Sequence, residues 1–322
     1  MNEPLLEVKD LVVEYSSGKK AVHAVNGISL SLAVGQTLGL VGETGAGKTT
    51  IAKSILRILP APQGTVKHGS ILFHGKNLLE MDKEEIRSVR GGKISMIFQD
   101  PMTSLNPVMR VIDQIAEGIR VHQAVSKAES ERLAVKMLNM VGISTDRAYD
   151  YPHQFSGGMK QRVVIAMALS CEPELLLADE PTTALDVTIQ AQVLELIGKL
   201  KQDYKTSLLM ITHDLGVVAE VCDYVAVIYA GRIVEYGTKL AVFDHPSHPY
   251  TVGLFNSIPD LQKDVDRLSP IKGLPPDPTN LPKGCPFSPR CPFASEACHR
   301  EVPLLKALKE DSTHYCRCVR EA

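Results

Sequence analysis

The chain lacks the features that would place it in a membrane or on a nucleic acid. No apolar run in its 322 residues approaches the roughly 18 residues that a membrane span requires. Its formal net charge is −2, so there is no basic excess to attract nucleic acid or an acidic membrane. The first residues show no basic stretch followed by an apolar core, the pattern of a signal peptide. We therefore expect a cytoplasmic protein that meets a membrane only through a partner.

The chain also has no internal repeat. Its apolar content of 44% and charged content of 22% are ordinary for a soluble globular protein. A chain of this length accommodates one large domain with an appendage, or two domains.

A glycine-rich stretch organises the sequence. Gly42 is followed by four residues and then by Gly47-Lys48-Thr49, which is the phosphate-loop pattern. The glycines let successive backbone N–H groups turn toward an anion, and the helix that opens at Lys48 adds its positive dipole end. Lys48 can reach the β- and γ-phosphates of a nucleotide, and Thr49 can offer its hydroxyl to Mg²⁺. An apolar strand before the loop and a helical pattern after it supply the expected context.

Strand and helix patterns alternate along most of the chain. We predict strands at 5–15, 25–34, 37–41, 69–74, 93–98, 175–180, 206–212, 224–229 and 232–236. We predict helices at 51–59, 109–122, 127–141, 159–170, 187–200, 215–222 and 251–257. The alternation indicates an α/β fold with a mostly parallel sheet, a small antiparallel subdomain from the early strands, and a helical block at about 101–170. Ligands of such sheets bind at the carboxyl ends of strands, where Gly42, Asp179 and His213 would lie.

Two adjacent acids end the strand at 175–180. Phosphoryl hydrolysis needs a carboxylate that holds Mg²⁺ and a group that polarises the attacking water, and Asp179 and Glu180 can supply both. The alternative is a solvated acidic turn, which the upstream phosphate loop makes a minor possibility.

Three further features have both a catalytic and a plain interpretation. Gln99 ends a strand and can contact Mg²⁺ or its water, or it is a loop glutamine. His213 can hydrogen-bond a γ-phosphate, or it occupies a helix cap position. Ser156-Gly157-Gly158 precedes a helix and can cradle a second anion, that of a partner subunit, or Ser156 is an N-cap. Tyr15 likewise either stacks on an adenine ring or covers the sheet.

Taken in order, these features resemble the nucleotide-binding subunit of an ABC transporter over residues 5 to about 256. The pieces are Tyr15, the Walker A loop at 42–49, Gln99 of the Q-loop, the signature at 155–162, the Walker B strand at 175–180, the D-loop at 183–186 and the switch histidine His213. The resemblance implies that ATP and Mg²⁺ contact Tyr15, Gly42, Glu43, Thr44, Gly45, Ala46, Gly47, Lys48, Thr49, Thr50, Gln99 and Asp179. It implies that Glu180 is the general base, that His213 and Gln99 are further catalytic residues, and that Gln99 links the site to the membrane subunits. It also implies that Ser156, Gly157, Gly158 and Met159 bind the partner's ATP.

The resemblance extends to the dipeptide and oligopeptide importer branch of this family. It rests on the runs at 151–159 and 178–188, on His248-Pro249-Tyr250-Thr251, and on 281–291. In that branch Met159 replaces the common glutamine. The implied partners are a second homologous ATPase subunit, two transmembrane permease subunits and an extracytoplasmic peptide-binding protein, with no nucleic acid. The implied location is the cytoplasmic face of the membrane. The alternatives are nickel or another solute, or a non-transport ATPase of the same class.

Five of the seven cysteines crowd into the last 38 residues, in a proline-rich stretch that favours an irregular extension at 257–322 beyond a nucleotide-binding domain at 1–256. In a reducing cytosol such a cluster is more often metal-binding than disulfide-bonded. Structural zinc usually takes close cysteine pairs, whereas the wide spacing here favours an iron–sulfur cluster. The resemblance points to [4Fe–4S] as well. The expected ligands are Cys285, Cys291, Cys298 and Cys316, with Cys318 as the alternative fourth.

Overall fold

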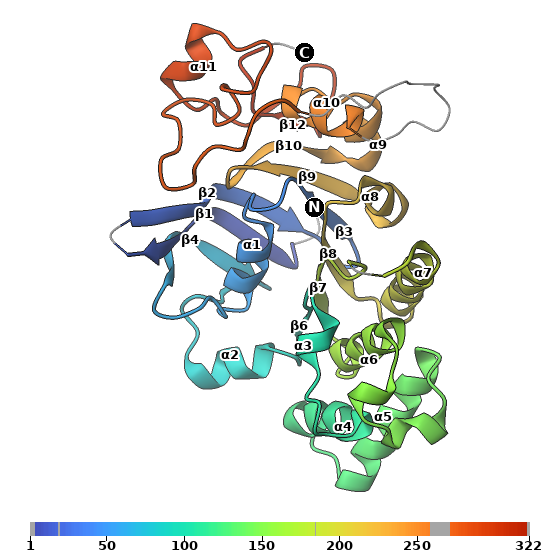
Figure 1. Cartoon of the computed structure of the whole chain (residues 1–322). Coiled ribbons are helices and arrows are strands. Elements are labelled where there is room, and N and C mark those ends of the chain that lie inside the picture. The colour runs from blue at the N-terminus through green and yellow to red at the C-terminus, as the bar shows by residue number, and fades with distance from the viewer. Residues whose placement is uncertain (1–3, 19, 184, 258–270, 321–322) are drawn as a thin grey trace. The chain divides into compact units, whose positions relative to one another are not determined.

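A computed structural model of the chain describes residues 4–18, 20–183, 185–257 and 271–320 (Figure 1). The described residues divide into two compact units that interleave along the sequence. The first unit takes Met1–Leu32, Leu38–Leu79 and Thr212–Ala322, and the second takes Ala33–Thr37 and Glu80–Ile211. The domain boundary predicted at residue 257 adjoins 258–270, which lie outside the described residues.

The first unit contains the predicted antiparallel subdomain. Its four strands run in the order β2-β1-β4-β5, and every neighbouring pair is antiparallel. The strands are β1 (Leu6–Ser17), β2 (Lys20–Leu32), β4 (Gly64–Phe73) and β5 (Lys76–Asn77). Alternate apolar residues of β1 and β2, such as Leu11, Val13 and Ile28, are fully buried, which explains the period of two in the sequence.

The same unit contains a second group of paired strands. β3 (Thr37–Val41) pairs in parallel with β9 (Tyr224–Tyr229), and β10 (Arg232–Thr238) follows β9 as an antiparallel neighbour. β12 (Tyr315–Cys316) pairs with β10, and β11 (Lys306–Ala307) pairs with β12. The helices of this unit are α1 (Lys48–Ile55), α8 (Leu215–Val221), α9 (Lys239–Asp244), α10 (Pro249–Asn256) and α11 (Glu296–Arg300).

The second unit contains three parallel strands and most of the helices. β6 (Ile94–Ile97), β7 (Leu175–Asp179) and β8 (Ser207–Thr212) pair in parallel in this order and are buried along their whole length. Their continuous apolar runs are typical of strands covered on both faces. The helical elements are α2 (Lys83–Val89), α3 (Pro101–Ser104), α4 (Val111–His122), α5 (Lys127–Met140), η1 (Thr145–Tyr149), η2 (Pro152–Gln154), α6 (Gly157–Leu169) and α7 (Val187–Tyr204). The predicted α/β fold with a helical block is therefore confirmed.

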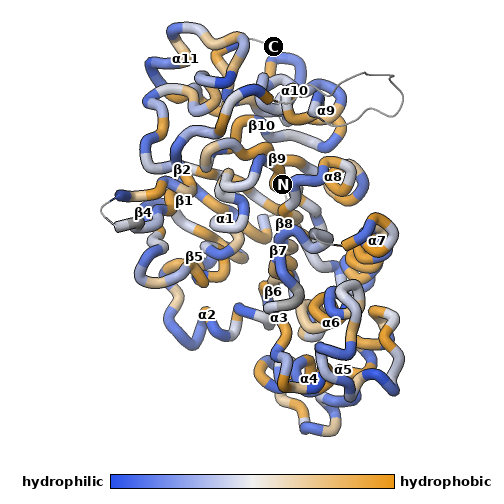
Figure 2. The backbone as a smooth tube through the Cα atoms, in the orientation of Figure 1, coloured by the Kyte–Doolittle hydropathy of each residue, from blue (hydrophilic) through white to orange (hydrophobic). Residues whose placement is uncertain are grey.

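Polar residues at the helix starts explain where the helices begin. The Asp82 carboxylate accepts from the N–H groups of Glu84 and Glu85, and the Asp186 carboxylate accepts from Ile189 N–H at the start of α7. Such caps satisfy N–H groups that have no partner within the helix. In helices α4 and α7, hydrophobic and hydrophilic residues alternate along the tube in Figure 2, as expected for helices with one buried face.

A buried carboxylate ties the C-terminal extension to the rest of the first unit. Glu235 on β10 is fully buried. Its Oε1 accepts from Ser247 N–H at 2.8 Å and lies 2.7 Å from Nε2 of His314, and its Oε2 accepts from His248 N–H at 2.8 Å. Both oxygens are thus satisfied by groups from the start of α10 and from the segment before β12. A buried charge needs such partners, because unpaired burial costs several kcal/mol.

We predict that Glu235→Ala destabilises the protein by about 3 kcal/mol, because it leaves two buried N–H groups and His314 without their acceptor. Thermal unfolding followed by circular dichroism measures the loss. Glu310→Ala, which removes an exposed carboxylate from the same extension, is the matched control and should change the free energy of unfolding by less than about 0.5 kcal/mol. Equal effects of the two variants would contradict the anchoring role of Glu235.

Candidate nucleotide site and cysteine-rich extension

The phosphate loop joins β3 to α1 in the first unit, as predicted. Its glycines adopt positive φ angles, +155° at Gly42, +81° at Gly45 and +101° at Gly47. A Cβ at Gly42 would collide with the carbonyl oxygen of Ile228, and a Cβ at Gly47 would collide with that of Ala24. Two of the three positions therefore require glycine for space as well as for conformation.

Lys48 is buried and already engaged with the loop. Its Nζ donates to the carbonyl oxygens of Gly42 at 2.7 Å and Glu43 at 3.1 Å. Thr49 and Thr50 follow in the first turn of α1, where backbone N–H groups have no acceptor within the helix itself. The loop and helix start thus bring a cation, hydroxyl groups and backbone donors together, which is the donor set that a nucleotide phosphate requires.

Tyr15 lies near the end of β1 and contacts the same helix. Its hydroxyl is 3.3 Å from Oγ1 of Thr50, and its ring packs against Gly64. This contact places the aromatic ring beside the start of α1 and leaves both interpretations of Tyr15, stacking and sheet cover, as predictions.

His213 also belongs to the first unit, directly after β8. Its side chain is exposed. The cap of α8 is the next residue, Asp214, whose carboxylate accepts from the N–H groups of Gly216 and Val217. The plain interpretation of His213 as a helix cap is therefore wrong.

The second unit holds the acidic residues. Asp179 ends β7 and is buried. Glu180 follows it in the left-handed region with a φ of +48°, an uncommon conformation for a residue with a Cβ. The Glu180 Oε2 accepts from Gln99 Nε2 at 3.0 Å and from Thr183 Oγ1 at 3.0 Å. The structure thus brings Gln99 and Glu180 together, two residues predicted as catalytic from separate parts of the sequence.

The signature residues form the N-terminus of α6 in the second unit. Ser156 is the N-cap and its Oγ accepts from Met159 N–H at 3.4 Å. Gly157 and Gly158 are the first two residues of the helix. The N-cap interpretation of Ser156 is confirmed, and it is compatible with anion binding because the backbone donors of the first helical turn remain exposed at this end. Ala184 of the predicted D-loop lies outside the described residues.

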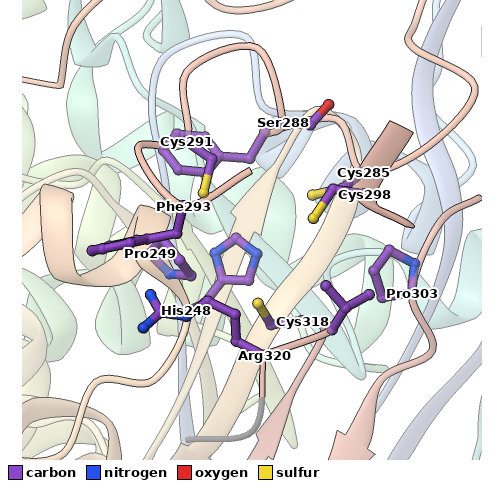
Figure 3. Close-up of a pocket in the computed structure, with 12 residues that line it drawn as sticks. His248, Pro249, Cys285, Ser288, Cys291, Phe293, Cys298, Pro303, Cys318 and Arg320 are labelled. Carbon is purple, nitrogen blue, oxygen red and sulfur yellow. The ribbon is translucent and has the colours of Figure 1, made fainter. Parts of the chain in front are cut away.

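Four cysteines of the C-terminal extension line one cavity. They are Cys285, Cys291, Cys298 and Cys318, and Figure 3 shows their sulfur atoms directed toward a shared space. Cys316 is not among the lining residues, because it lies in β12 opposite Glu235. Burial, followed by the charge of Glu235, raises the pKa of Cys316. Of the expected ligand sets, the alternative with Cys318 is the one whose members share the cavity.

Several polar groups surround these thiols. Burial raises the pKa of Cys285 and of Cys291, and hydrogen bonds from the N–H groups of Phe287 and Phe293 act in the opposite direction. Ser295 N–H lies 3.5 Å from the sulfur of Cys298. In the part of the chain that the structure describes, no three His, Cys, Asp or Glu side chains stand close enough together to hold a metal ion.

Comparison with known proteins assigns the family. The ABC transporter family matches residues 25–183, and the family described as the C-terminal region of oligopeptide/dipeptide transporters matches 234–298. The chain is 51% identical over 315 residues to the oligopeptide transport ATP-binding protein OppD of Haemophilus influenzae, with 97% of each chain covered. The chain belongs to the ABC transporter ATPase family.

Two further likenesses agree with this assignment. The dipeptide transport ATP-binding protein DppD of Bacillus subtilis is 48% identical over 318 residues, covering 98% of this chain and 94% of that protein. The dimeric structure of MJ0796, a bacterial ABC transporter cassette, superposes with a TM-score of 0.65 at 26% identity, covering 73% of this chain and 98% of that one. This ABC transporter ATPase therefore hydrolyses ATP. No helix among its described residues combines the length and hydropathy of a membrane span.

Sequence reasoning missed two residues that contact the phosphate loop of this ATPase. The Tyr250 hydroxyl accepts from Glu43 N–H at 2.9 Å, and the Arg290 guanidinium pairs with the Glu43 carboxylate. Both contacts join residues more than 200 positions apart, so no local pattern could have indicated them.

We predict that Gly47→Ala destabilises the protein by about 2 kcal/mol and weakens MgATP binding, because the added methyl group meets Ala24 and the left-handed backbone is strained. Gly45→Ala is the matched control, since Gly45 is also left-handed but has open space around its Cβ position. It should cost about 1 kcal/mol. Thermal unfolding and MgATP titration of the two variants measure the difference, and equal losses would contradict the steric argument.

Proposed function

We propose that this chain is the ATP-binding and hydrolysing subunit of a bacterial importer for di- and oligopeptides. The observation that carries the proposal is the pairing, in one chain, of an ABC cassette with the C-terminal region described for oligopeptide/dipeptide transporters. The names of the relatives OppD and DppD support the same solute class. We propose residues 1–256 as the nucleotide-binding domain and 257–322 as its extension.

The residue roles follow from the chemistry of each group. Lys48 and the backbone donors at the start of α1 would neutralise the β- and γ-phosphates, and Thr49 with Asp179 would hold Mg²⁺. The ion would screen the negative charge that develops during phosphoryl transfer. Glu180 would accept a proton from the attacking water. Its hydrogen bonds from Gln99 and Thr183 keep the carboxylate oriented, which supports this role.

His213 and Tyr15 complete the proposed ATP site. The imidazole of His213, which is exposed directly after β8, would hydrogen-bond the γ-phosphate. The ring of Tyr15 offers a face for the adenine base.

We infer that the working unit is a dimer of ATPase subunits. The helix start at Ser156, Gly157 and Gly158 is a second phosphate cradle in a chain that already carries a phosphate loop. Because the phosphate loop already serves the chain's own ATP, the second cradle is left to bind the ATP of a partner subunit. The dimeric cassette MJ0796 supports this arrangement. We propose a second homologous ATPase, two permease subunits and an extracytoplasmic peptide-binding protein as partners, which places the chain at the cytoplasmic face of the membrane.

We further propose that Cys285, Cys291, Cys298 and Cys318 hold a [4Fe–4S] cluster. Four thiols around one cavity supply the ligand number. Backbone N–H groups donate toward the sulfurs of Cys285, Cys291 and Cys298, and hydrogen bonds to the ligand sulfurs stabilise such clusters. Binding would draw the thiols closer together and supply structural rigidity to an extension with few regular elements.

The first test uses the transporter assembled with its cognate subunits. Glu180→Gln should reduce ATP hydrolysis and uptake of a labelled tripeptide at least about a hundredfold, while MgATP binding is kept, because only the base is lost. Glu195→Gln, on the exposed face of α7, is the control and should leave both rates unchanged. Uptake of nickel without uptake of peptide by the unmodified transporter would contradict the proposed solute.

The cluster is tested by assaying iron and sulfide and recording visible absorption of the full chain. We expect about four irons per chain, loss of iron and colour in Cys318→Ser, and retention of both in Cys316→Ser. The reason is that only Cys318 shares the cavity with the other three thiols. Colourless protein with stoichiometric zinc would contradict the cluster, and loss of iron only in Cys316→Ser would contradict the ligand set.

A further inference from the structure

The C-terminal extension reaches the phosphate loop through Arg290. The guanidinium group makes a two-point contact with Glu43: NH1 donates to Oε2 at 2.8 Å and NH2 donates to Oε1 at 3.1 Å. The Arg290 side chain is only 5% exposed, so this ion pair is shielded from solvent on the arginine side. Such forked contacts combine charge with fixed geometry.

Every donor of Arg290 is used. Nε donates to the carbonyl oxygen of Lys272 at 3.1 Å, NH1 also donates to the hydroxyl of Tyr229 at 3.2 Å, and NH2 also donates to the carbonyl oxygen of Ile271 at 3.4 Å. Together with the two bonds to Glu43, these account for all five N–H groups of the side chain. Arg290 is therefore held in one orientation by the extension and by β9.

Glu43 is held at three points in turn. Its carboxylate pairs with Arg290, its N–H donates to the Tyr250 hydroxyl at 2.9 Å, and its carbonyl oxygen accepts from Lys48 Nζ at 3.1 Å. The last bond links it to the lysine of the phosphate loop. A side chain of the extension thus acts, through a single residue, on the group that neutralises the nucleotide phosphates.

An aromatic cluster connects these contacts to the thiol cavity. The rings of Tyr229, Tyr250 and Phe287 lie with centroids 4.6 to 5.5 Å apart. Phe287 also lines the cavity with Cys285 and Cys291, and Arg290 is the residue before Cys291. The turn at 285–291 therefore directs thiols to the cavity and a guanidinium to the phosphate loop.

We infer that Arg290 is a positioning residue for the nucleotide site. It neutralises the Glu43 carboxylate, which would otherwise repel the triphosphate. Together with Tyr250 it also fixes the Glu43 backbone, whose carbonyl oxygen accepts from Lys48. The inference rests on the proposed function only through ATP binding, and it does not require the cluster or a particular solute.

The test measures MgATP binding to the purified full chain by titration calorimetry. Arg290→Met should weaken binding about tenfold, because the carboxylate loses its counter-charge. Arg290→Lys should restore part of the affinity, since it keeps the charge and loses the fork. Arg300→Met, which removes an exposed arginine from the same extension, is the matched control and should bind as the unmodified chain does.

A double variant separates electrostatics from a general loss of structure. Adding Glu43→Gln to Arg290→Met removes the unpaired carboxylate and should recover most of the affinity, so the two effects should not add. In the assembled transporter, Arg290→Met should raise KM for MgATP with little change in kcat. Binding of Arg290→Met within about twofold of the Arg300→Met control, or an equal loss with and without Glu43→Gln, would overturn the inference.

Two further measurements keep the outcomes distinct. If Arg290→Met unfolds, Tyr250→Phe tests the same linkage, because it keeps the ring and deletes the acceptor of Glu43 N–H. It should weaken MgATP binding. Unchanged MgATP binding would overturn the linkage. If the unmodified chain binds MgATP but contains no iron, the cluster proposal fails and the Arg290 test stands. Absence of MgATP binding by the unmodified chain would overturn both the nucleotide role and the inference.

Discussion

The phosphate loop must keep its backbone donors turned toward a ligand, so its conformation has to be fixed from the opposite side. Carbonyl groups of β2 and β9 approach Gly47 and Gly42 so closely that a side chain would not fit. Gly231 N–H, in the turn between β9 and β10, donates to the carbonyl oxygen of Ala46 at 3.0 Å. These neighbours fix the loop from the side of β2 and β9. Much of the first unit can be understood as the frame of this loop.

The proposed catalytic groups are organised separately within each unit. Lys48 and His213 lie in the first unit, and Glu180 with Gln99 lies in the second. Glu180 combines a left-handed backbone with two side-chain donors on one carboxylate oxygen. A strained residue persists only where its surroundings hold it, and such residues cluster at functional sites. The hydrogen bonds that orient the proposed base therefore come from its own unit and do not depend on a bound nucleotide.

The sequence could predict the parts of the site that depend on local pattern. The phosphate loop, the Walker B acids and the N-cap at Ser156 each occupy a few consecutive residues next to a strand or helix with a clear period, and the structure forms them there. Contacts across the chain were not predictable, because nothing near Glu43 in the sequence indicates a partner 247 positions away. The choice between Cys316 and Cys318 stays a prediction for a related reason. The position of Cys316 depends on β12 pairing with β10, and β12 is only two residues long.

The buried and half-buried carboxylates of the first unit show why the extension cannot be treated as an independent appendage. Glu235 lies 2.7 Å from Nε2 of His314, and Glu43 is paired with Arg290, so two acids of the cassette depend on donors within residues 290–320. Without them, each carboxylate would lose its hydrogen-bond donors, and an unpaired charge is costly away from solvent. The same segment contributes β12 to the edge of β10 and covers its backbone groups. Polar groups of the cassette and of the cysteine-rich segment therefore satisfy one another, which explains why 271–320 belong to the unit that carries the phosphate loop.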